Sequence, residues 1–192
     1  MLDSTTVPAW INRIIEDIRD SDFLHLSLYI INAERKPRRS LFTRIRRRLP
    51  TILYVLYSRL DRYLFKQPRD AFEQVEVFVP PHTIDTIRVV PVRRAFEHRF
   101  EQCDVEAVRS RNLDVILRFG FNIIRGEILD AAKYGIWSYH HGDNAEYRGV
   151  PAFFWEMQEN NPVSGTLLQQ LTEELDGGNV IYRSYASTDM SS

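Results

Sequence analysis

The chain has 192 residues, enough for one ordinary domain with a filled core, and 44% of them are hydrophobic and 27% charged. That composition excludes a disordered or fibrous protein. The longest apolar run, Ile52 to Tyr57, is six residues long, far short of the ~20 that span a bilayer. The single cysteine, Cys103, excludes an internal disulfide and favours a cytoplasmic setting. We expect one domain over residues 1–192, either complete or a fragment of a longer chain.

The net charge of -1 conceals a basic segment. From Arg35 to Leu60 there are nine basic residues and no acidic one. Such a segment is either a solvated surface or a place that holds phosphate, because clustered arginines offer forked donors. A nucleic-acid or membrane-surface binding domain built around Arg35 to Arg48 is therefore one alternative.

Helical and strand periodicities alternate along the chain. In the first half we expect helices over Val7 to Arg19 and Ile52 to Phe65, and strands over Leu24 to Ile31, Val75 to Val79 and Ile87 to Val92. The apolar stripe of the second helix is expected to face the core. In the second half we expect helices over Asp104 to Arg111 and Gly126 to Lys133, and strands over Leu113 to Leu117 and Ile136 to Tyr139. This order predicts an α/β fold in three layers, with a mainly parallel, Rossmann-like sheet and helices on both faces.

Ligands of such sheets bind at the carboxyl ends of the strands. The run after the strand at Ile136 to Tyr139 is unusually polar and begins His140-His141-Gly142-Asp143-Asn144. That is a functional hint, although adjacent histidines are also common on solvated loops. No Glu or Cys stands at a metal-ligand spacing beside them, so we expect no metal site. Farther on, Thr166 to Leu171 and Val180-Ile181 flank an Asp-Gly-Gly turn, which by composition predicts a hairpin.

Three segments, taken together, form a pattern specific enough to indicate a protein family. His140 is followed eight residues on by Arg148-Gly149, and a later loop reads Leu175-Asp176-Gly177-Gly178. Upstream, Leu113 to Ile124 carries Gly120 at a turn after a buried strand. These motifs resemble those of the formyltransferase family, which includes methionyl-tRNA formyltransferase and glycinamide ribonucleotide transformylase. The resemblance covers Asn112 to about Ile181 well and the rest by element order.

The resemblance implies transfer of a formyl group from 10-formyltetrahydrofolate to a primary amine. On this reading His140 donates to the tetrahedral oxyanion, while Asp176 orients His140 and accepts the amine proton. His141, Arg148 and Gly149 would shape the loop near the acceptor, with Arg148 bracing it. The backbone of one loop would hold the pteridine ring: Phe119, Gly120, Phe121, Asn122 and Ile123.

Two features depart from the family pattern. The family carries Asn two residues before the catalytic histidine, and here that position is Ser138; Asn144 could replace the amide if its loop folds back. Only Met1-Leu2 precede the polar run Asp3 to Thr6 that leads into the first helical segment, so the first strand is expected to be truncated. Two alternatives therefore stay open, a 10-formyltetrahydrofolate hydrolase and a catalytically silent module that binds a folate or an aminosugar. The acceptor could be a sugar amine, a nucleotide or an aminoacyl group, with or without phosphate, and the oligomeric state is not predicted.

Overall fold

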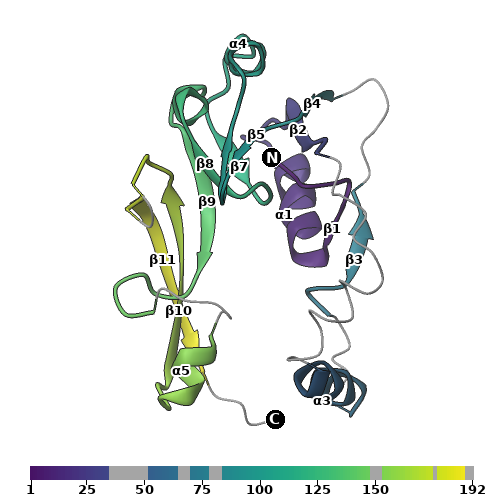
Figure 1. The fold of residues 1–192 in the computed structure, drawn as a ribbon, viewed down its shortest axis with the longest axis vertical. Coiled ribbons are helices and arrows are strands. Elements are labelled where there is room, and N and C mark those ends of the chain that lie inside the picture. The colour runs from purple at the N-terminus through teal and green to yellow at the C-terminus, as the bar shows by residue number, and fades with distance from the viewer. Residues whose placement is uncertain (35–51, 65–69, 78–83, 148–152, 175–176, 189–192) are drawn as a thin grey trace. The chain divides into compact units, whose positions relative to one another are not determined.

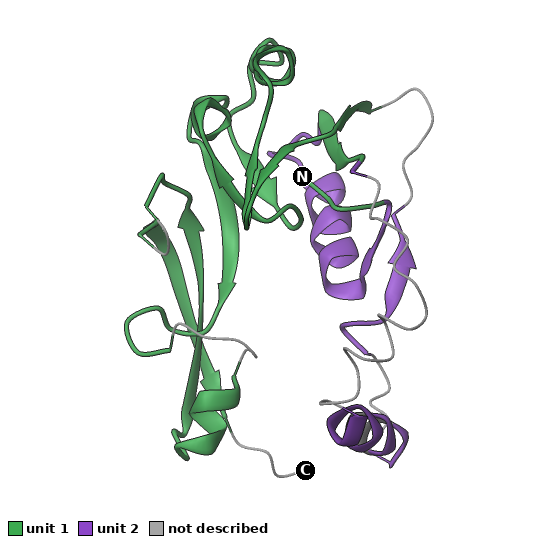
Figure 2. Ribbon diagram, in the orientation of Figure 1, with its two compact units in different colours: residues 1–4, 27–33, 80–192 green, residues 5–26, 34–79 purple. Residues whose placement is uncertain are grey.

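The computed structural model describes residues 1–34, 52–64, 70–77, 84–147, 153–174 and 177–188. The chain divides into two compact units, coloured separately in Figure 2. Unit 1 comprises Met1–Ser4, Ser27–Ala33 and Pro80–Ser192, and unit 2 comprises Thr5–Leu26 and Glu34–Val79. The predicted site residues that the structure describes all belong to unit 1. The expectation of one catalytic domain over residues 1–192 stays a prediction.

Unit 1 contains the strands that carry the site (Figure 1). β7 (Ile116–Arg118) pairs parallel with β9 (Ile136–His141), and β9 pairs antiparallel with β10 (Val163–Gln170). β10 in turn pairs antiparallel with β11 (Asn179–Ser187), so the predicted hairpin is confirmed. A separate parallel pair joins β2 (Leu28–Asn32) and β4 (Asp85–Val89). The α/β class is confirmed, and its sheets mix parallel and antiparallel pairs.

Met1 and Leu2 lie between these two groups of strands. Leu2 forms a parallel bridge to Ile31 of β2. On the other side, the nitrogen of Met1 donates to the carbonyl of Leu117 at 2.6 Å, and the nitrogen of Phe119 donates to the carbonyl of Met1 at 3.0 Å. The first strand, which the sequence predicts to be truncated, is thus reduced to the single bridge between Leu2 and Ile31.

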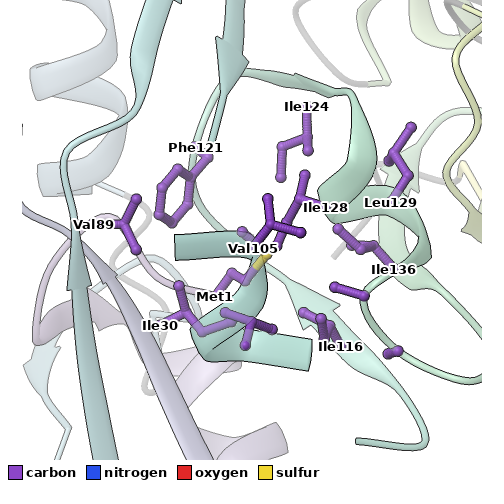
Figure 3. Packing of buried hydrophobic residues seen from close by; sticks show 13 residues of the cluster. Met1, Ile30, Val89, Val105, Ile116, Phe121, Ile124, Ile128, Leu129 and Ile136 are labelled. Carbon is purple, nitrogen blue, oxygen red and sulfur yellow. The ribbon is translucent and has the colours of Figure 1, made fainter. Parts of the chain in front are cut away.

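The described part of unit 1 also contains a third sheet and three short helices. The sheet has the order β5 (Val92–Arg94), β6 (Glu97–Arg99) and β8 (Ile123–Arg125). The helices are α4 (Gln102–Arg109), the 3-10 helix η2 (Glu127–Asp130) and α5 (Phe154–Gln158). Figure 3 shows the core that α4 and η2 form with the strands, with Val105 of α4, Ile128 of η2 and Ile136 of β9 buried together. This core includes Ile116 and Ile136, the first residues of β7 and β9.

Unit 2 contains β1 (Thr6–Pro8), α1 (Ala9–Asp20), α3 (Ile52–Leu64) and β3 (Gln74–Glu76), with β1 and β3 antiparallel. The first helix begins two residues later than predicted, because Val7 and Pro8 belong to β1. Ile11 and Ile15 form its buried side.

The prediction for α3 is wrong in one respect. Its bounds agree with the sequence, yet its apolar stripe is exposed, with Leu53 79% and Leu60 57% accessible. Helical periodicity identifies a face but not its partner. The Arg35 to Arg48 segment lies outside the described residues. None of the helices in the described ranges is long and apolar enough to cross a membrane.

Candidate active site

Strand alternation sorts the residues of β9. Successive side chains of a strand point to opposite faces, so Ser138 and His140 share one face and His141 lies on the other. Ser138 is 2% exposed, His140 is half-buried and His141 is exposed. The structure therefore brings the two predicted catalytic positions of β9 together on the more buried face.

His140 has an unsatisfied polar atom. Its Nε2 is buried, and no hydrogen-bond partner lies near it in the described part of the chain. A buried polar atom without a partner costs free energy, and ligand-binding sites are a common place for one. On the opposite face, loss of hydration lowers the pKa of His141, and the neighbouring His140 lowers it further.

The hydroxyl of Ser138 is held by a cation. Arg118 is its register partner on β7, and Arg118 Nη1 donates to Ser138 Oγ at 3.1 Å. The hydroxyl in turn is 3.3 Å from the carbonyl of Tyr139, to which it donates. Burial lowers the pKa of Arg118, while the nearby Asp3 carboxylate acts in the opposite direction. A guanidinium stays protonated in proteins, so the position of the family amide lies beside a positive charge.

The predicted folate loop follows Arg118 directly. Its residue Phe121 has a left-handed backbone, with φ of 66°, which is strained for a bulky side chain. Three contacts hold the strained turn: Asp3 Oδ1 accepts from the Phe121 nitrogen at 2.7 Å, Arg118 Nη2 donates to the Phe121 carbonyl at 2.7 Å, and His98 Nδ1 accepts from the Asn122 nitrogen at 3.1 Å. The ring of Phe121 is buried against Phe100, with centroids 5.4 Å apart. The loop is therefore firmly constrained.

Tight packing also explains Gly120. A Cβ at this position would lie 2.3 Å from the nitrogen of Asp3. The remaining members of the predicted loop differ in exposure: Phe119 and Ile123 are half-buried, whereas Asn122 is exposed.

The loop after β9 is fastened to β11. Asp143 Oδ1 accepts from Arg183 Nη1 at 2.5 Å, and Asp143 Oδ2 accepts from the Tyr185 hydroxyl at 3.1 Å. The Ala145 amide, which donates to the same carboxylate, lowers the pKa of Asp143 most, and Tyr185 and Arg183 lower it further. The side chain of Asn144 accepts from Arg183 at 3.0 Å. Its proposed role as a substitute amide stays a prediction.

A buried acid lies beside this loop. Glu156 on α5 is 1% exposed, and its Oε1 is one of the buried oxygens for which the described ranges provide no hydrogen-bond partner. That oxygen would lie 4.0 Å from a Cβ added to Gly142. The neighbouring Phe153 ring makes an edge contact with His141 at 6.3 Å.

Three of the predicted site residues, Arg148, Gly149 and Asp176, lie outside the described residues. The chain leading to Asp176 is anchored, since Glu173 Oε1 accepts from the Gly126 nitrogen at 2.6 Å. A cavity of about 540 Å³ does occur in unit 1, but it lies at the amino ends of β7 and β9, lined in part by Asp114, Lys133 and Gly135. That is the opposite end of these strands from His140. The searched residues contain no group of three acidic, histidine or cysteine side chains suited to a metal ion.

Sequence reasoning missed Arg118, Asp3 and His98. Arg118 carried a signal, because it is the one charged residue between Val115 and Asn122 in a run that is otherwise apolar or glycine. Asp3 and His98 carried none, since each meets the loop across more than 20 residues of sequence.

The whole fold matches those of solved formyltransferases. Glycinamide ribonucleotide transformylase 1 from Symbiobacterium toebii aligns over 97% of this chain and 71% of its own, with a TM-score of 0.55 and 14% identity. Phosphoribosylglycinamide formyltransferase from Bacillus halodurans aligns over 97% and 79%, with a TM-score of 0.54 and 15% identity. The class defined by the architecture is thus the formyltransferase fold.

Two curated relatives extend this likeness to sequence. Methionyl-tRNA formyltransferase of Phenylobacterium zucineum (strain HLK1) is 30% identical over 104 residues, and that of Bacillus mycoides (strain KBAB4) is 27% identical over 108 residues. The matches cover 53% and 56% of this chain but only 33% and 32% of the relatives. No family model matches the chain. The sequence matches and the fold thus agree that the chain is similar to formyltransferases, and it spans about a third of the length of these curated relatives.

Proposed function

We propose that the protein transfers a formyl group from 10-formyltetrahydrofolate to a primary amine. The observation that carries this proposal is the buried Nε2 of His140, which has no hydrogen-bond partner among the described residues and lies on the face of β9 that also carries Ser138. The constrained loop, which Arg118 joins to Ser138, supports a role in holding a rigid ligand, because strained backbone concentrates at functional sites. A reduced, cytoplasmic setting fits this activity and the single cysteine.

The proposed reaction needs two functions from the protein. The amine nitrogen bonds to the formyl carbon as the carbonyl electron pair moves to oxygen, and His140 donates a hydrogen bond to that oxyanion. Asp176, directly or through water, accepts the proton that the amine loses. The carbonyl then re-forms, the bond to the folate nitrogen breaks, and that nitrogen takes up a proton. The products are an N-formyl amine and tetrahydrofolate.

We propose that the loop from Phe119 to Ile123 binds the pteridine. The backbone nitrogens of Phe119, Phe121, Asn122 and Ile123 already donate within the fold, so the exposed residue Asn122 is the most accessible part of this loop for a ligand. We propose a small amine, such as a sugar amine, as the acceptor. The basic residues of the sequence between Arg35 and Arg48 would suit an acceptor that carries phosphate.

The decisive experiment measures release of tetrahydrofolate from 10-formyltetrahydrofolate over a panel of sugar, nucleotide and aminoacyl amines. We expect amine-dependent turnover that His140→Asn lowers by about 10²- to 10⁴-fold, the usual contribution of a general acid or base. His25→Asn, at an exposed histidine of unit 2, is the matched control and should behave as wild type.

The same assay separates the alternatives. Formate release that needs no amine would identify a hydrolase, in which water replaces the amine. Failure of the wild type to consume the donor with any acceptor would refute both enzyme proposals. Binding of a folate without turnover would then support the silent module, in which the Ser138 hydroxyl is committed to Arg118.

A further inference from the structure

We propose that Arg118 is a positioning residue for formyl transfer, which joins the Ser138 hydroxyl to the predicted folate loop in place of the amide that the family carries. This inference rests on the proposed function. The family motif offers a neutral side-chain amide at that position, whereas this chain offers a short hydroxyl next to a guanidinium.

One fork of hydrogen bonds makes the connection. Arg118 Nη1 donates to Ser138 Oγ at 3.1 Å, while Nη2 donates to the carbonyls of Phe121 at 2.7 Å and Asn122 at 2.9 Å. A planar guanidinium holds such partners in a fixed relative geometry that a lysine could not reproduce in full. The position of the hydroxyl and the position of the loop are therefore coupled through one side chain.

The fork also sets the direction of the hydroxyl proton. Because Arg118 donates to Ser138 Oγ, the hydroxyl must use its own hydrogen as a donor elsewhere, and its present acceptor is the Tyr139 carbonyl at a long 3.3 Å. A hydroxyl that accepts from a cation becomes a stronger donor, since hydrogen bonds in a chain polarise one another. An oxyanion forming beside His140 would be a better acceptor than that distant carbonyl.

The hydrogen bonds of Arg118 lie in a partly buried environment, where a positive charge interacts more strongly with nearby dipoles. Ser138 is buried, and Arg118 Nε is itself buried without a partner among the residues that the structure describes. Charge–dipole interactions strengthen where water is excluded. The cation would thus compensate for the shorter reach of serine compared with asparagine.

A purely structural role for Arg118 makes different predictions. If it only held the two loop carbonyls, its loss would weaken folate binding and raise KM while leaving kcat unchanged. If it acts through Ser138, its loss lowers kcat. The split between kcat and KM therefore separates the two roles.

The test measures kcat and KM for 10-formyltetrahydrofolate in Arg118→Met, Arg118→Lys, Ser138→Ala and the Arg118→Met/Ser138→Ala double variant. Arg13→Met, on the exposed face of α1, is the matched control. We expect Arg118→Met and Ser138→Ala each to lower kcat about 10- to 100-fold, somewhat less than loss of a direct oxyanion donor. The double variant should be no slower than Arg118→Met, and Arg118→Lys should recover part of kcat.

The outcomes are distinguishable. An inactive wild type refutes the proposed function, and the inference with it. An active wild type with Arg118→Met within twofold of its kcat refutes the inference alone, as does a double variant whose losses multiply. Thermal unfolding of each variant identifies those that fail to fold. If Arg118→Met fails to fold, the test uses the kcat of Ser138→Ala and the recovery of kcat in Arg118→Lys instead. A wild-type kcat in Ser138→Ala would overturn the inference.

Discussion

The backbone nitrogen of Phe121 donates to Asp3 Oδ1 at 2.7 Å, although the two residues are 118 positions apart. Asp3 Oδ1 also accepts from the side chain of Asn32 at 3.2 Å. One carboxylate therefore connects the start of the chain, the end of β2 and the loop that we propose to bind folate. Its removal should loosen the loop before it disturbs the rest of unit 1.

Asp3→Ala is expected to lower the free energy of unfolding by about 1–2 kcal/mol, the value of hydrogen bonds to a charged group less a discount for exposure. Asp3→Asn should cost less, because an amide oxygen can still accept from Phe121. Chemical denaturation measures both. Asp130→Ala, at an exposed aspartate of η2, serves as the control and should stay within about 0.5 kcal/mol of wild type.

Gly120→Ala should be more damaging. The added Cβ would lie 2.3 Å from the nitrogen of Asp3 and 2.8 Å from the carbonyl carbon of Leu2, and both are backbone atoms of the segment that forms the bridge to β2. We expect a loss of about 3 kcal/mol in denaturation experiments. Gly177→Ala is the matched comparison, because the three atoms nearest to its Cβ would belong to the flexible side chain of Glu174. Equal losses in the two variants would contradict the packing at Gly120.

Asp143 should stabilise the loop after β9. Asp143→Ala removes acceptors for Arg183, Tyr185 and the Ala145 nitrogen, and we expect a cost of about 2 kcal/mol. Since the folded-state pKa of Asp143 lies below its ordinary 3.8, its contribution is complete above that pH and is lost as the pH falls through the folded-state value. The free energies of unfolding of wild type and variant, measured at neutral and at acidic pH, should therefore become similar in acid.

His141 should also make the stability of the protein depend on pH, because burial of its imidazole disfavours the protonated form. Its folded-state pKa is lowered from 6.5, so below that pH the unfolded chain binds the proton more readily than the folded protein. Stability should fall as the pH drops below 6.5 and level off beneath the folded-state pKa. His141→Gln should flatten this part of the curve, as measured by urea unfolding at a series of pH values. An unaltered slope in the variant would show that His141 has the same pKa in the folded and the unfolded protein.

Local patterns predicted most of the strands that carry the site. The apolar run of β9 was placed within two residues, and the hairpin of β10 and β11 followed from alternation around an Asp-Gly turn. Short segments were less predictable: the helix expected over Gly126 to Lys133 is a four-residue 3-10 helix. Gly126 has a φ of 88°, which lies outside helical backbone, and only the surrounding fold requires that conformation.

The connections within the site could not be read from periodicity. Ser138 and His140 share a face because they are two residues apart, and the sequence alone implies that relationship. The partnership of Arg118 with Ser138 depends on the register between β7 and β9, which the local pattern of neither strand specifies. The exposed stripe of α3 is the converse case, since an amphipathic pattern leaves its partner unspecified.

The alternation along β9 also gives the two adjacent imidazoles unequal access to small electrophiles. A reagent that acylates histidine rings from solution should label His141 early, because His141 is the more exposed of the two residues. His140 should react later, and occupancy of the neighbouring loop should slow it further. Mass-spectrometric footprinting of this one dipeptide could therefore report ligand binding without any knowledge of the acceptor.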